Sequence, residues 1–154
     1  MGKVILVASG KGGTGKTMFS ANMGAVLAQR GYNVLLIDMD MGLRNMDLYL
    51  GMENSVVYNI MDVLSGICRI SKAIIRVDGF GSLYFMAAAP KLDERDITPL
   101  HMQILCAKLR EVFAQTPTGG SSREYWTMGA TLIQRRRVSE EVFRYVKLYQ
   151  QGRK

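Results

Sequence analysis

Three uninterrupted apolar runs set the pattern of the first 115 residues. Residues 4–8 read VILVA, residues 34–37 read VLLI and residues 83–87 read LYFMA. Apolar runs without polar alternation are typical of strands that are buried on both faces of a parallel sheet. We therefore predict three such strands.

Helical spacing appears between the first two runs. Phe19, Met23, Val26 and Leu27 recur at this spacing, and Gly31 follows as a C-terminal cap. A strand, a helix and a second strand within forty residues predict a right-handed βαβ unit and thus an α/β fold.

Further helices are expected along the rest of this region. Apolar periodicity predicts a helix over 56–64, and Thr98 followed by proline predicts a helix from there to about residue 114. We expect a loop or short helix over 41–50 and a short helix or turn over 71–77.

The most informative motif is a glycine-rich loop directly after the first predicted strand. Residues 10–17 read GKGGTGKT and fit the pattern G-x-x-x-x-G-K-[ST] in full. In such a loop, converging main-chain amides bind phosphate oxygens, and the next helix points its positive end at the same anion. Lys16 is expected to reach the β and γ phosphates, and the Thr17 hydroxyl to bind Mg²⁺. The residues predicted to bind the nucleotide are Gly10, Lys11, Gly12, Gly13, Thr14, Gly15, Lys16, Thr17 and Met18.

Lys11 adds a second cation at the entrance of this loop. Its side chain cannot easily fold back onto the phosphates that its own loop binds. It is therefore available to a nucleotide in another subunit, and the alternative is a solvated loop lysine.

Two aspartates follow the second predicted strand. Asp38 and Asp40 lie at the carboxyl end of this strand, the edge at which open α/β sheets bind ligands. Carboxylates there can orient Mg²⁺-bound water or hold the attacking water in line with the γ phosphate. We expect Asp38 at the metal and Asp40, with Lys11 and Lys16, in catalysis; either aspartate could instead cap a loop.

The formal net charge of +7 is concentrated at the end of the chain, where residues 135–154 contain seven Lys and Arg against two Glu. Apolar residues at helical spacing from Val138 predict a basic amphipathic helix there. Such a helix can bind anionic lipid. Because Tyr145 and Tyr149 insert weakly, a solvated or body-packed helix is preferred, and nucleic acid is the least favoured partner.

No apolar run approaches the roughly 18 to 20 residues that span a bilayer. Two isolated cysteines and one histidine argue against a zinc site or a redox motif. We expect a cytoplasmic protein.

The loop with its additional lysine resembles the deviant Walker A motif of the MinD/ParA family of ATPases. Residues 38–48, DMDMGLRNMDL, are similar to the switch I region of the MinD branch of this family. Residues 56–59, VVYN, and the apolar run 83–88 that leads into Ala89-Pro90 are similar to it as well. The resemblance covers about residues 2–115.

The resemblance implies a P-loop NTPase-type parallel sheet flanked by helices, with ATP and Mg²⁺ as cofactors. It implies ATP hydrolysis and a face-to-face homodimer in which Lys11 contacts the partner's nucleotide, Thr17 binds Mg²⁺ and Asp40 helps to activate water. It also implies bacterial division-site selection: peripheral docking on the inner face of the cell membrane, recruitment of MinC and release by MinE.

The chain departs from the family after residue 115. The family has a strand there, beside the first strand, that supplies the Walker B aspartate and switch II. Residues 116–122 instead predict a loop, and residues 125–134 have no clear period. We expect a domain over 1–115 without its Walker B strand and a divergent tail over 116–154. Unless the segment 125–133 enters the sheet, backbone groups beside the gap stay unpaired and hydrolysis is impaired.

Three functions remain open. The first is a MinD-like ATPase, the second a truncated remnant that binds ATP without hydrolysis, and the third a ParA-type partition ATPase. Residues 42–47 favour the first over the third, and the missing strand favours the second over the first.

Overall fold

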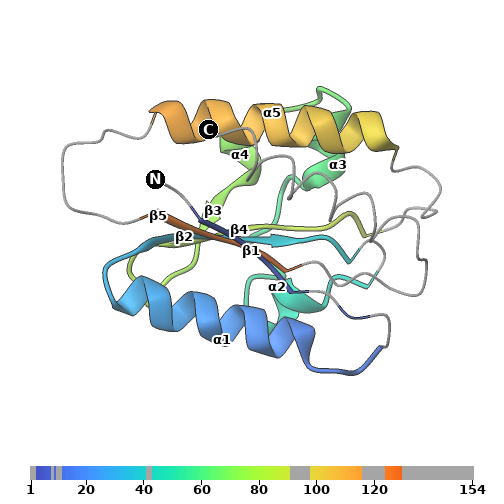
Figure 1. Cartoon of the computed structure of the whole chain (residues 1–154). Coiled ribbons are helices and arrows are strands. Elements are labelled where there is room, and N and C mark those ends of the chain that lie inside the picture. Colours follow the sequence, from blue (N-terminus) through green and yellow to red (C-terminus); the bar gives the residue numbers. More distant parts are fainter. Residues whose placement is uncertain are drawn as a thin grey trace.

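A five-stranded sheet with the strand order β1-β5-β2-β4-β3 forms the centre of the molecule (Figure 1). The computed structural model describes residues 3–7, 9, 12–40, 43–90, 98–115 and 124–129. Its strands are β1 (Lys3–Leu6), β2 (Asn33–Asp38), β3 (Ile75–Arg76), β4 (Leu83–Met86) and β5 (Glu124–Gly129). The neighbouring strands β1, β5, β2 and β4 are parallel, and β3 pairs antiparallel with β4.

Helices cover both faces of this sheet, as Figure 1 shows. On one face lie α1 (Lys16–Gln29) and α2 (Asn45–Tyr49); on the other lie α3 (Ile60–Leu64), α4 (Ile70–Ala73) and α5 (Pro99–Gln115). Leu35 and Ile37 of β2 belong to the core beneath α3, α4 and α5, whereas Val34 and Leu36 belong to the core on the α1 side. The continuous apolar run is thus buried on both faces, and the predicted α/β fold is confirmed.

The gap expected beside β1 is filled by β5, which is the exception that the sequence analysis left open for the segment 125–133. Val4 pairs with Trp126, and Val34 of β2 pairs with Tyr125 on the other side of β5. Backbone pairing needs only an extended segment, and residues 124–129 include the strand-favouring types Tyr, Trp and Thr. This strand lies in the stretch assigned to the tail. The loop predicted over 116–122 and the helix predicted from Val138 lie outside the described residues.

Small side chains make most of the fully buried contacts of α1, and of the predicted stripe Leu27 packs against the core whereas Phe19 and Val26 do not. Phe19 and Val26 are 55% and 47% exposed. A Cβ atom at Gly24 would lie 2.9 Å from the Cδ2 atom of Leu36, so the helix approaches β2 too closely for a larger residue. The buried residues of α1 are Lys16, Ser20, Ala21, Gly24 and Ala28.

The helix predicted over 56–64 is shorter in the structure, because α3 begins at Ile60. Asn59 sets this start: its side-chain oxygen accepts hydrogen bonds from the Met61 and Asp62 amides at 2.8 and 3.4 Å. The Asp62 carboxylate accepts one from the Asn59 amide at 2.8 Å. This reciprocal pair is a capping box, which satisfies amides that have no partner within the helix.

The other predicted elements that lie within the described residues agree with the structure, and one strand is added to them. The loop over 41–50 contains α2, and residues 71–77 contain the end of α4 and the short β3, which the sequence pattern did not predict. α5 begins at Pro99, and the Thr98 hydroxyl accepts a hydrogen bond from the His101 amide at 3.3 Å. Over the described residues, no helix is long and apolar enough to cross a membrane.

We predict that Asn59→Ala lowers the free energy of unfolding by about 1 kcal/mol, because the amides of Met61 and Asp62 lose their acceptor. Urea unfolding followed by circular dichroism measures this loss. Asn54→Ala, at an exposed loop position, is the matched control. Equal losses in the two variants would contradict a specific role for the cap.

Candidate functional site

The carboxyl ends of the parallel strands bring the predicted site residues to one edge of the sheet. The glycine-rich loop follows β1 and leads directly into α1, whose first residue is Lys16. Gly13 and Gly15 have φ angles of 71° and 79°, a left-handed conformation that favours glycine. Asp38 ends β2. Gly10 and Lys11 lie outside the described residues.

A cavity of about 380 Å³ opens at this edge. It is lined on one side by residues 12–18, which include every described residue predicted to bind the nucleotide. Asp40 lies on its wall as well. The structure therefore brings Lys16, Thr17 and Asp40 together around one space, as the motifs predict.

Lys16 is 7% exposed although it carries a cationic side chain. Its Nζ atom lies 3.5 Å from the Thr14 hydroxyl oxygen. The first amides of a helix have no acceptor within it, and the helix dipole adds positive potential at the same end. The lysine and the start of α1 thus form an environment suited to an anion, and phosphate is the anion that such loops bind.

Asp38 is 2% exposed and is not one of the residues that line the cavity. Its Oδ1 atom accepts a hydrogen bond from the Asp40 amide at 2.9 Å. Burial raises the pKa of Asp38 to about 7, an effect that the Asp40 amide opposes and that the negative charges of Asp40 and Asp47 reinforce. Of the two aspartates, Asp40 is the one that lines the cavity.

The residues present fit a magnesium ion at this edge. Thr17, which has a hydroxyl group, and Asp40, which has a carboxyl group, both line the same cavity. Mg²⁺ prefers oxygen ligands and is commonly bound by one or two protein groups together with substrate phosphates. Thr17 and Asp40 could supply the protein oxygens, whereas Asp38, which the sequence analysis placed at the metal, does not line the cavity.

The cavity is also lined by three residues that the sequence analysis did not predict as site residues, namely Leu43, Asn45 and Tyr49. All three come from α2 and the turn before it, which face the glycine-rich loop. The Tyr49 hydroxyl accepts a hydrogen bond from the Asn22 side chain of α1 at 2.9 Å. The similarity of residues 38–48 to a switch region is the signal that could have identified this wall.

The chain is similar in sequence to proteins of a nucleotide-binding family. A profile of the CobQ/CobB/MinD/ParA nucleotide binding domain matches residues 5–139. The septum site-determining protein MinD of Bacillus subtilis is 40% identical over 114 residues, which cover 73% of this chain and 42% of that protein. The MinD protein of Synechocystis is 44% identical over 113 residues, with the same coverage. The chain thus spans about two fifths of the length of these relatives.

Solved structures agree with the sequence matches. The MinC:MinD cell division protein complex of Aquifex aeolicus superposes with a TM-score of 0.70 at 33% identity, covering 92% of this chain and 52% of the other. MinD of Pyrococcus horikoshii, complexed with Mg-ADP, gives 0.57 at 32% identity, covering 82% and 48%. These neighbours confirm the P-loop NTPase-type fold. Because the profile matches most of its length, the chain belongs to the CobQ/CobB/MinD/ParA nucleotide-binding family.

Proposed function

We propose that the cavity binds Mg·ATP and that the chain is the nucleotide-binding part of a MinD-like ATPase of bacterial division-site selection. The observation that carries this proposal is the convergence of the glycine-rich loop, buried Lys16, Thr17 and Asp40 on one cavity. The relatives named septum site-determining protein MinD and the neighbour that contains Mg-ADP support it.

In this proposal each residue has a defined role. The loop amides bind the phosphate oxygens, and the Lys16 ammonium group neutralises charge on the β and γ phosphates. Thr17 and Asp40 hold the metal and the attacking water, with Asp38 orienting the Asp40 backbone through its hydrogen bond. Mg²⁺, when bound, would polarise the phosphoryl oxygens.

Partners follow from the family. The MinC:MinD complex among the structural neighbours supports MinC as a partner. A homodimer in which Lys11 contacts the second nucleotide, release by MinE, and peripheral binding to an anionic membrane through the basic tail are proposed from the resemblance alone.

A second candidate function is ATP binding without hydrolysis. β5 occupies the place of the family's Walker B strand, but it ends in Thr127-Met128-Gly129 and has no carboxylate at that end. The carboxylates described at this edge of the sheet come instead from β2 and the residues that follow it.

The third alternative, a ParA-type partition ATPase, is also a family relative, and residues 42–47 favour the MinD branch over it.

We predict that Lys16→Ala weakens the binding of Mg·ATP about 10- to 100-fold, because a buried hydrogen-bonding cation is lost. Isothermal titration calorimetry measures the dissociation constant. Lys72→Ala, at an exposed position of α4, removes the same charge away from the cavity and should bind like the unmodified chain. Equal affinities in all three proteins would remove the proposed site.

Hydrolysis separates the two leading candidates. If the chain is an ATPase, the unmodified protein releases phosphate from Mg·ATP and Asp40→Asn slows this release at least about tenfold, since the attacking water loses its carboxylate. A coupled phosphate-release assay measures both rates. Release at the buffer background, with nucleotide binding intact, would instead establish the second candidate.

Asp38 gives the ligand-free chain a defined pH dependence. Because its folded-state pKa is raised from 3.8 to about 7, the stability due to its bound proton is full below pH 3.8 and is lost as the pH rises through 7. We expect the free energy of unfolding to fall between pH 5 and 7 by at most about 1.4 kcal/mol per pH unit and to level off above. Urea titrations should show a smaller slope in Asp38→Asn, and an unchanged slope would contradict the assignment.

A further inference from the structure

Arg44 has an unusual backbone conformation. Its φ and ψ angles are 42° and 51°, and among the described residues it is the one non-glycine residue with a positive φ. The left-handed region is unfavourable for a residue with a side chain, and such strain persists only where the surroundings hold it.

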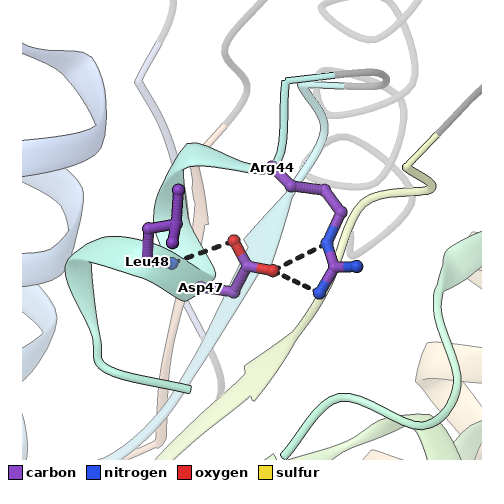
Figure 2. Close-up of polar contacts among 3 residues, drawn as sticks. All are labelled: Arg44, Asp47 and Leu48. Carbon is purple, nitrogen blue, oxygen red and sulfur yellow. Dashed lines mark hydrogen bonds and ion pairs between the residues drawn. The ribbon is translucent and has the colours of Figure 1, made fainter. Parts of the chain in front are cut away.

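The carboxylate of Asp47 is the group that holds Arg44 in this conformation. The Arg44 Nε atom donates a hydrogen bond to Asp47 Oδ2, and the distance between these atoms is 2.6 Å. The Arg44 Nη2 atom is paired with the same oxygen, and Figure 2 shows both interactions. Asp47 Oδ1 accepts a hydrogen bond from the Leu48 amide at 2.9 Å. The Asp47 side chain is only 3% exposed. Separating the pair would therefore leave a buried charge without its partner, which is strongly unfavourable.

Arg44 lies directly between Leu43 and Asn45, which both line the cavity. The helix that follows has other anchors: Met46 is fully buried in the core, and Tyr49 is hydrogen-bonded to Asn22 of α1. The entry into α2 depends on residue 44, which is the N-cap of this helix and has the left-handed conformation. The ion pair thus acts on the part of the wall that faces the glycine-rich loop.

We propose that Arg44 is a positioning residue of the nucleotide site. Its ion pair with buried Asp47 holds residue 44 in the left-handed conformation and so keeps Leu43 and Asn45 in the wall of the cavity. The inference rests on the proposed function, because the wall matters only if the cavity binds a nucleotide. Without the pair, a residue 44 with a Cβ atom is no longer held in this unfavourable conformation, and the wall moves away from the cavity.

Two substitutions at residue 44 separate the backbone from the charge. Arg44→Ala removes the ion pair and keeps the strain of a left-handed Cβ residue, whereas Arg44→Gly removes the ion pair and the strain together. We expect the dissociation constant for Mg·ATP to rise about tenfold in Arg44→Ala and about threefold or less in Arg44→Gly. Arg30→Ala removes the same charge at the C-terminal end of α1 and should bind normally.

Amide hydrogen exchange over residues 43–49 of the full chain gives a readout that does not need nucleotide. Exchange should be faster in Arg44→Ala than in Arg44→Gly. Circular dichroism checks that each variant is folded. If Arg44→Ala does not fold, Arg44→Gln, which also loses the charge and keeps the strain, takes its place.

The outcomes distinguish this inference from the proposed function. Equal losses of affinity in Arg44→Ala and Arg44→Gly, or no loss in either, would overturn the positioning role while Lys16→Ala still loses binding. If the unmodified chain binds no Mg·ATP, both the proposed function and the inference fail. Better binding by Arg44→Gly than by Arg44→Ala supports the inference, since loss of charge alone predicts no difference between the two.

Discussion

The pairing of β5 with both β1 and β2 is the constraint on which the site depends. Neighbouring strands lie about 4.8 Å apart, so one intervening strand separates β1 from β2 by about 10 Å. The glycine-rich loop follows β1, Asp38 is the last residue of β2, and Asp40 follows β2. The space between the two exits is where the cavity opens. The same pairing satisfies the backbone groups that a gap in the centre of the sheet would leave without partners.

Close packing of α1 on the sheet has a direct consequence for this cavity. Gly24 lets the helix approach Leu36, and apart from Lys16 the other buried residues of α1 are also small. A helix held this near to β2 places its N-terminal turn, with Lys16 and Thr17, at the carboxyl edge of the strands. The position of the phosphate-binding groups is therefore set by packing several turns away from them.

Negative charge accumulates at this edge, where Asp38, Asp40 and Asp47 are each 2% exposed. Such burial is costly for carboxylates unless each is protonated, hydrogen-bonded or paired with a cation. The cost is met differently for each of the three aspartates. Asp38 has a raised pKa and a backbone hydrogen bond, and Asp47 is paired with Arg44. Asp40 lines the cavity, where a bound cation could compensate its negative charge. The acidic edge is thus consistent with a site for a metal-bound nucleotide.

The sequence by itself determined the parallel strands β1, β2 and β4, the helix after the glycine-rich loop and the identity of that loop. Each depends on local signals: continuous apolar runs, glycines with required φ angles and a lysine at fixed spacing. Asp38 and Asp40 were predictable for the same reason, because they directly follow a recognisable strand.

Only the tertiary structure decided the rest. β5 carries no motif and no clear period, and its place in the sheet comes from pairing with strands about 90 to 120 residues away in the chain. The face that α1 buries was decided by how closely it packs on Leu36, and the wall formed by Leu43, Asn45 and Tyr49 by the packing of α2 against α1. These features depend on contacts between distant segments, which hydrophobic periodicity within one segment does not encode.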